Sequence, residues 1–243
     1  SIKLKEGIQL FNDLFLKMIE VIMYIAPYGV FFLIFKTFFT QGFETIFELG
    51  EYFFTVLLVL FIHLIFTYGG ILFFLGKINV LKFFYKMKNS MLFAFSTSSS
   101  AATIPVNLKT VEENLGVNKS VASFTVPLGA TINMDGTAIM QGVATVFLAN
   151  TYGVDLNLSD FISVILIATL ASIGTAGVPG VGLIMLTMVL NQVGLPVEGI
   201  ALIIGIDRIL DMTRTAVNVT GDATISCIVA KIENKIDLKK INS

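Results

Sequence analysis

The sequence predicts an all-α membrane protein, with about four transmembrane helices and two re-entrant helical hairpins of opposite orientation. Hydrophobic residues make up 55% of the chain and charged residues 14%, with a mean hydropathy of +0.86. An ordinary soluble domain has about 25% charged residues. Residues 52–76 carry no formal charge and exceed the ~20 residues that a helix needs to cross the hydrocarbon. These observations indicate a chain that lies in lipid.

Uncharged segments divide the chain into a short first part and a long core. We expect residues 1–45 to form a partial transmembrane helix and residues 46–243 to form the core. The predicted elements of the core are, in order, a helix at 50–76, a re-entrant hairpin at 82–108, an unwound helix at 119–150, a second re-entrant hairpin at 158–197 and a charged helix at 199–232.

Lysines cluster after two of the hydrophobic segments. Four lie at residues 77–88 and four at residues 231–240, whereas the connectors at 41–51 and 151–160 carry acids and no base. Because Lys and Arg are enriched in cytoplasmic loops, we expect both clusters and the C-terminus in the cytoplasm. The net charge of −1 gives no indication of nucleic-acid binding.

Two hydrophobic segments are unsuited to a single crossing. The first, in the hairpin predicted at 82–108, holds a serine run and Pro105. These residues suit a hairpin buried in protein better than a helix that faces lipid. The second, residues 161–197, would form a helix of ~55 Å, and Gly and Pro at 174–182 interrupt it. Charge placement brings the two hairpins in from opposite faces, an arrangement typical of inverted repeats in secondary transporters.

A polar stripe follows the last helix. At 100° per residue, one face carries Asp207, Arg208, Asp211, Arg214, Thr215, Asn218 and Asp222. A charge at the bilayer centre costs ~2.5 to 3.5 kcal/mol, so this face must meet protein or water. It is either a binding site or a set of ion pairs that only holds the helix to its neighbours. With Asp135, four acids stand against two bases, which favours bound cations.

A second polar island, NMDGT, lies at residues 133–137 in an otherwise apolar helix. Asn, Asp and Gly are poor helix formers, so the backbone here can release carbonyl groups from the helical ladder. Carbonyl and carboxylate oxygens at an unwound helix are ligands for Na⁺ in transporters. The motif therefore predicts a cation site.

Together these motifs resemble the dicarboxylate/amino acid:cation symporters, which include archaeal aspartate transporters and mammalian excitatory amino acid transporters. The motifs that carry the resemblance are STSSSAATIPV (96–106), PLGATINMDGT (127–137), ASIGTAGVPG (171–180) and DMTRTAVNVTGD (211–222). They stand in the family's order. The resemblance covers nearly the whole chain but only the family's C-terminal portion. It implies that residues 1–45 are of scaffold type and that 46–243 form a transport core.

The resemblance also implies a substrate site. Arg214 is similar to the arginine that binds the substrate's side-chain carboxylate in a bidentate manner, and Asp211 to the acid that binds its ammonium group. This pair implies an acidic amino acid, aspartate or glutamate. The implied substrate-binding residues are Ser99, Ser100, Thr137, Val178, Gly182, Asp211, Arg214, Thr215 and Asn218.

Sodium is the cofactor that the resemblance implies. One ion would lie between the backbone carbonyls of Gly129, Asn133 and Asn218 and the Asp222 carboxylate. A second would use the backbone carbonyls of Thr131, Met134, Ser172, Ile173 and Thr175. A third would use Asn133 and Asp135 with a helix that this chain lacks. We expect no organic cofactor.

The chain departs from the family at one arginine. Relatives carry an additional Arg at the position of Ser98 or of Met212, and we hypothesise that Arg208 substitutes for it. His63 is interpreted as a helix-contact residue, with proton coupling as the alternative, because no acid stands near it in the sequence.

We therefore expect no enzyme but a sodium-coupled symporter that works by alternating access in a lipid bilayer, trimeric when full-length. Its location would be a cytoplasmic membrane, that of a prokaryote. Proton-coupled glutamate or C4-dicarboxylate symport, and a fragment that binds without transporting, remain alternatives. An intramembrane aspartyl protease is disfavoured because an arginine opposes a shared-proton acid pair. A channel is disfavoured because two meeting hairpin tips would obstruct a pore.

Overall fold

The computed structural model describes residues 44–242 and isolated positions between Gly7 and Phe39. It contains two units, residues 1–47 and residues 48–243. In the first unit the described positions are helical, and Phe35 stacks on Phe31 and on Phe39 with ring centroids 6.4 and 6.2 Å apart. This is the i, i+4 spacing of one helical face. The other residues of the helix predicted at 1–45 lie outside the described part of the chain.

From Glu44 to Asn242 the regular elements are helices, with one isolated β-bridge between Val117 and Ile236. The all-α prediction is confirmed for these residues. The elements are α2 (Glu44–Ile62), η1 (His63–Tyr68), η2 (Ile71–Gly76), α3 (Val80–Thr97), α4 (Ser100–Lys109), η3 (Thr110–Asn114), α5 (Lys119–Ile132), α6 (Asp135–Thr151), α7 (Leu158–Ile173), α8 (Val181–Gln192), η4 (Val197–Gly199), α9 (Ile200–Ile232) and α10 (Leu238–Asn242).

One continuous helix, Phe47–Gly76, is the only one in the described part of the chain that is long and apolar enough to cross a membrane. At 1.5 Å per residue its 30 residues extend ~45 Å. Its second half winds as the π-helical segments η1 and η2. Such widened turns often mark functional positions, and η1 begins at His63.

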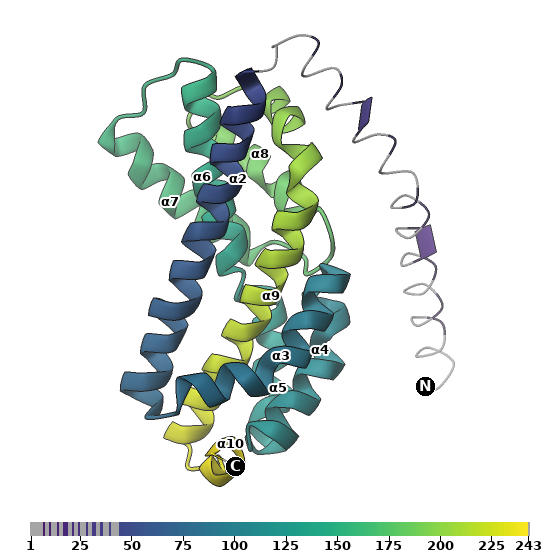
Figure 1. Ribbon diagram of the computed structural model, residues 1–243, viewed down its shortest axis with the longest axis vertical. Helices are drawn as coiled ribbons and strands as arrows, with labels where there is room; N and C mark the ends of the chain where they lie inside the picture. The colour runs from purple at the N-terminus through teal and green to yellow at the C-terminus, as the bar shows by residue number, and fades with distance from the viewer. Residues whose placement is uncertain are drawn as a thin grey trace. The chain divides into compact units, whose positions relative to one another are not determined.

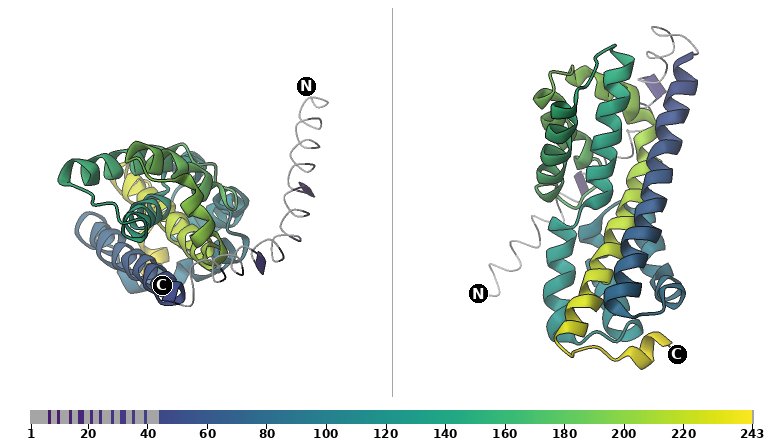
Figure 2. Two further views of the ribbon diagram at one scale, coloured as in Figure 1. Left: turned by 90° about the horizontal axis from the view of Figure 1, so that it is seen from above. Right: turned by 90° about the vertical axis from the view of Figure 1, so that its left-hand side faces the viewer.

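Two helical hairpins lie toward opposite ends of the second unit. Ser98 and Ser99 join α3 to α4, and residues 174–180 join α7 to α8. Figure 1 shows α6, α7 and α8 around one half of α9, and α3, α4 and α5 around the other half; the second view in Figure 2 agrees. In both hairpins a side-chain cap starts one helix: Ser99 Oγ accepts the amide of Ala102 at the start of α4, and Asn157 forms a capping box with Asp160 at the start of α7.

The apolar core consists of two clusters that share α9. Leu202, Ile203 and Leu210 belong to the first cluster, with side chains of α2, α6, α7 and α8. Val219 and Ala223 belong to the second, with side chains of α3, α5 and α10. The buried charged residues of α9 and Asn218 lie between Asp207 and Asp222, where members of both clusters also stand. The fold therefore holds a polar centre between two apolar halves.

The two lysine clusters lie together at one end of the second unit. Lys231 donates from Nζ to the carbonyl of Gly76, and Lys86 donates from Nζ to the carbonyl of Lys240 at 2.7 Å. The amide of Asn118 donates to the carbonyl of Lys235 at 2.9 Å. Figure 1 places α10 at this end.

Candidate functional site

α5 and α6 follow each other directly and are separated by a break in the helix at the motif NMDGT, residues 133–137. Asn133 and Met134 leave the helical conformation, with φ and ψ of −96° and 71° and of −109° and 44°. The interruption turns the first turn of α6 toward α9, and the amide of Gly136 donates to Asn218 Oδ1 at 2.8 Å. Backbone groups released from the helix thereby face the polar stretch of α9.

The tips of the two hairpins touch each other beside this break. Ser99 Oγ and the amide of Ala101 both donate to the carbonyl of Gly177, at 2.7 and 3.1 Å. A side-chain carbon at Gly177 would lie 2.9 Å from the carbonyl oxygen of Ala130 and 3.1 Å from the amide nitrogen of Ala101. Only glycine permits this approach, because both neighbours are backbone atoms.

A small polar cavity lies behind the touching tips. Its volume is about 20 Å³. It is lined by Ser98, Ser100, Met134, Thr137, Thr175, Ala176, Gly177, Val178, Gly182, Asp211, Thr215 and Asn218. Space of this size holds about one water molecule, whereas ligand pockets measure ~300 Å³ or more. As it stands, the cavity is therefore too small for a ligand much larger than water.

Helix ends converge on this cavity. Ser100, Thr137 and Gly182 stand in the first turns of α4, α6 and α8, and Ser98 and Thr175 follow the last turns of α3 and α7. Helix N-termini favour anions and C-termini favour cations. The helix ends alone therefore provide the cavity with groups that favour an anion and groups that favour a cation.

The charged residues of α9 form a buried ion-pair group next to the cavity. Arg214 is 1% exposed and donates from Nη1 to Asp207 Oδ1 at 2.5 Å and from Nη2 to Asp211 Oδ1 at 3.0 Å. The amide of Gly180 donates to Asp211 Oδ2 at 3.0 Å. Asp211 therefore links the arginine to the tip of the α7–α8 hairpin.

Arg208 does not join this group. Its side chain is exposed, whereas Asp207 beside it is 3% exposed. The helical wheel placed Arg208 on the polar face together with Arg214, but only Arg214 is buried there. Of the two arginines counted against the acids Asp135, Asp207, Asp211 and Asp222, only Arg214 is buried, and it pairs with Asp207 and Asp211.

The residues of the first implied ion site lie together. Asn133 donates from Nδ2 to Asp222 Oδ1 and to the carbonyl of Asn218, both at 3.0 Å. A side chain at Gly129 would collide with the Asp222 carboxylate. Asp222 is 2% exposed, and no basic side chain is recorded as its partner in the described part of the chain. A buried carboxylate without a basic partner either takes up a proton or binds a cation.

The residues of the second implied ion site differ in where their side chains lie. Met134 and Thr175 both line the cavity, and Ser172 is buried, with its carbonyl accepting the amide of Thr175 at 3.0 Å. Thr131 and Ile173 turn their side chains to the surface. These two residues can contribute to an ion site only through their backbone carbonyls.

A hydrogen-bonded cluster that sequence reasoning missed surrounds Asp135. His63 Nε2 lies 3.1 Å from Asp135 Oδ2, and Tyr68 donates from its hydroxyl to the same oxygen at 2.9 Å. The histidine and tyrosine rings also meet edge to face, with centroids 4.7 Å apart. The acid missing from the neighbourhood of His63 in sequence is thus supplied from 72 residues away. The cavity is also lined by Ser98, Ala176 and Gly177, which were not predicted as site residues. The Oγ of Ser98 has no hydrogen-bond partner in the described structure.

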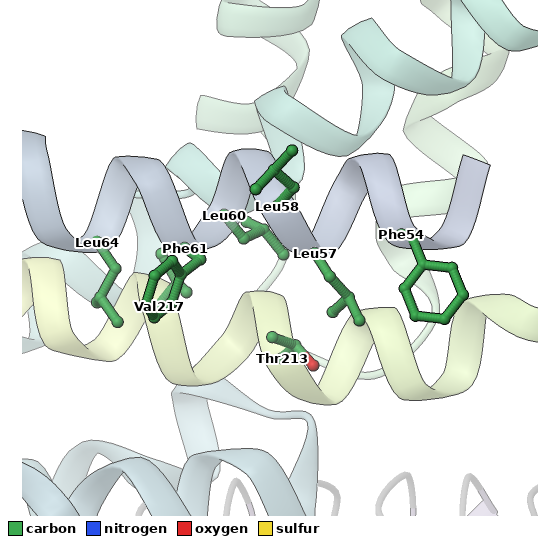
Figure 3. A pocket seen from close by; sticks show the side chains of 8 residues that line it. All are labelled: Phe54, Leu57, Leu58, Leu60, Phe61, Leu64, Thr213 and Val217. Carbon is green, nitrogen blue, oxygen red and sulfur yellow. The ribbon is translucent and has the colours of Figure 1, made fainter. Parts of the chain in front are cut away.

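A larger groove elsewhere lacks the chemistry of a site for a charged ligand. It has a volume of about 590 Å³ and lies between α2 and α9 (Figure 3). Its lining is leucine, phenylalanine and valine apart from Thr213, whose hydroxyl donates to the carbonyl of Ile209 at 2.9 Å. No charged side chain lines it.

Comparisons with known proteins agree with the motifs. The model of the sodium:dicarboxylate symporter family matches residues 2–232. The chain is 43% identical over 225 residues to human excitatory amino acid transporter 3, covering 92% of this chain and 43% of that protein. It is 40% identical over 239 residues to human excitatory amino acid transporter 2, covering 96% and 41%.

A third relative is rat excitatory amino acid transporter 1, 39% identical over 228 residues, which cover 93% of this chain and 42% of that protein. The chain thus spans roughly two fifths of the length of these curated relatives. The family match covers well over half of the chain. The predicted resemblance is confirmed, and the chain belongs to the sodium:dicarboxylate symporter family.

Proposed function

We propose that the chain forms the substrate-binding core of a sodium-coupled symporter for an acidic amino acid, aspartate or glutamate. The observation that carries the proposal is the placement of Asp211 and Arg214 beside a closed polar cavity between two hairpin tips. A guanidinium suits a carboxylate in bidentate geometry, and the Asp211 carboxylate suits an ammonium group. Both groups are engaged in the structure, Arg214 with Asp207 and Asp211, and Asp211 with Arg214 and Gly180, so a bound amino acid would replace part of these contacts. A simple dicarboxylate offers Asp211 no ammonium, which favours amino acids over C4-dicarboxylates.

Charge supports sodium coupling. Of the four acids, Asp207 and Asp211 pair with Arg214, whereas Asp135 contacts His63 and Asp222 has no recorded basic partner in the described residues. An acidic amino acid would add a further negative charge. Sodium ions at the Asp222 group, and at the carbonyls near Met134 and Thr175, would compensate it. His63 and Tyr68 would orient Asp135 for a third ion. The acid pair of an intramembrane protease has no support, because Arg214 bridges Asp207 and Asp211.

Substrate entry in this proposal requires the α7–α8 hairpin to open. The cavity is too small for an amino acid, and Asp211 holds Gly180 at the tip. Sodium and substrate would then close the tip again, after which the core moves between two membrane faces. The hairpins would be re-entrant from opposite sides, with the lysine end and the C-terminus in the cytoplasm.

The oligomeric state and the type of membrane are proposed from the family and from the sequence, not from contacts within the structure. The relatives that are named above come from mammals, and the location in a prokaryotic membrane stays a prediction. A homotrimer of the full-length protein is proposed in the same way. Cross-linking of the full-length protein in membranes tests it, with a three-subunit product as the expected result.

Calorimetry with L-aspartate tests the function. We expect binding heat in NaCl and none in choline chloride, and no heat from malate in either salt. Binding that is equal in the two salts would contradict sodium coupling. Uptake into vesicles then separates a transporting core from a fragment that only binds.

A further inference from the structure

The corner where η2 ends and α3 begins carries a groove that the proposed transport cycle does not use. Its volume is about 650 Å³, and its lining includes Phe73, Phe74, Lys77, Asn79 and Leu81. A second groove of about 340 Å³ adjoins it, since Leu81 lines both. Lys82, Tyr85 and Lys86 complete the second groove.

The corner combines exposed apolar side chains with ammonium groups. Leu81 is 82% exposed, Phe74 is 74% exposed and Tyr85 is 67% exposed. Lys77 ends η2 in a left-handed conformation with φ of 48°, and Lys88 holds its Nζ 4.3 Å from the ring centroid of Tyr85. A contiguous apolar surface rimmed by polar groups is typical of an interaction site.

The charge around this corner is strongly positive. Residues 76–90 and 231–243 together hold eight lysines and two acids, Glu233 and Asp237. Contacts between Lys86 and Lys240 and between Lys231 and Gly76 bring these two segments to one end of the unit. An anion that approaches this end meets lysines from both segments.

We propose that this corner binds an anionic phospholipid. The headgroup phosphate would lie against Lys77 and Lys82, and an acyl chain would cover Phe73, Phe74 and Leu81. A free phosphate would match only the charge and would make no contact with the apolar side chains. The proposal rests on the membrane placement of the proposed function. The lipid would fix the first turn of α3, where the α3–α4 hairpin begins, at the membrane surface.

The test measures lipid binding without aspartate. The chain, purified in a nonionic detergent, is titrated with dioleoyl phosphatidylglycerol or dioleoyl phosphatidylcholine, and bound lipid is counted by native mass spectrometry. Each lysine near an anionic surface contributes ~1 kcal/mol, so two lysines predict roughly 30-fold preference for phosphatidylglycerol. The double variant Lys77→Gln, Lys82→Gln is expected to bind the two lipids with affinities within about threefold of each other.

Two further variants locate the site. Lys109→Gln with Lys119→Gln removes two exposed lysines from outside the grooves and is expected to keep the preference. The double variant Phe73→Ala, Phe74→Ala is expected to weaken the binding of both lipids by the same factor. Equal binding of the two lipids by the unchanged chain overturns the proposal, and so does an equal loss in the Lys109, Lys119 variant. Full competition by glycerol 3-phosphate would overturn the lipid in favour of a soluble anion.

These outcomes are distinct from a failure of the proposed function. Lipid preference without sodium-dependent aspartate binding would leave the lipid site standing and remove the substrate site. Sodium-dependent aspartate binding without lipid preference would leave the substrate site standing and remove the lipid site.

Discussion

Arg214 has the most constrained side chain of the site. Its guanidinium is buried between Asp207 and Asp211, and its Nε has no hydrogen-bond partner in the described structure. Removing one member of a buried ion pair leaves the others uncompensated and costs ~3 to 5 kcal/mol. The same guanidinium must also receive the substrate's carboxylate in the proposed site.

We expect Arg214→Cys to weaken aspartate binding at least ~100-fold and to admit neutral amino acids, because the charge that selects a second carboxylate is lost. Calorimetry with aspartate and serine in NaCl measures both effects. Arg208→Ala is the matched control: its side chain is exposed, so its aspartate affinity should stay within about twofold. A retained aspartate preference in Arg214→Cys would refute the assigned role, and a large effect of Arg208→Ala would restore the sequence-based hypothesis for that residue.

Asp135 depends on donors from another helix. Loss of one hydrogen bond to a charged group costs ~1.5 to 3 kcal/mol, so Tyr68→Phe should lower the apparent sodium affinity by about tenfold or more. His63→Gln keeps a side-chain donor and should cost less than His63→Ala. Sodium titrations of aspartate binding measure both. Equal sodium affinity in Tyr68→Phe and the unchanged chain would show that Asp135 takes no part in ion binding.

These residues differ in how far sequence could predict them. Asp211 and Arg214 lie on one helix, so a rotation of 100° per residue places them on the same face. His63 and Asp135 are 72 residues apart, and only tertiary packing brings them together. The exposure of Arg208 was likewise out of reach, since a wheel gives a direction but not the neighbour that covers it.

At the scale of elements, the α7–α8 tip closes the site through glycine backbone. The carbonyl of Gly177 accepts two hydrogen bonds from the α3–α4 tip, and the amide of Gly180 donates to Asp211. Composition predicted the turn at 174–182, because Gly and Pro interrupt a helix too long for one crossing. The contact between the tips depends on how both hairpins pack on α9, which composition does not encode.

Gly177→Ala should therefore hold the tip open. The added carbon meets backbone atoms at 2.9 and 3.1 Å, so the tip must shift and the aspartate affinity should fall about tenfold or more. Gly142→Ala is the matched control, because no atom lies within 4 Å of its added carbon and alanine favours a helix. Calorimetry measures affinity, and thermal unfolding checks that both variants fold. Equal affinities of the two variants would exclude the tip contact as a determinant of binding.

At the scale of the whole molecule, negative charge accumulates at the centre of a fold that is apolar on both sides. The two apolar clusters share α9, and its polar stretch lies between them with Asp222 buried. A substrate with net negative charge increases this excess. Binding is therefore expected to depend on the concentration of a compensating cation, in the manner of linked equilibria.

The logarithm of the aspartate affinity should rise with the logarithm of sodium concentration at a slope of about two or more, because each ion taken up with substrate contributes one unit. Asp222→Asn removes the buried carboxylate of the Asn133 group while keeping its size, so its slope should fall by about one. Asp155→Asn, which changes an exposed acid in the α6–α7 connector, should keep the slope. A slope that is the same in all three proteins would place the coupled ions away from Asp222, and a slope near zero in the unchanged chain would remove sodium from the mechanism.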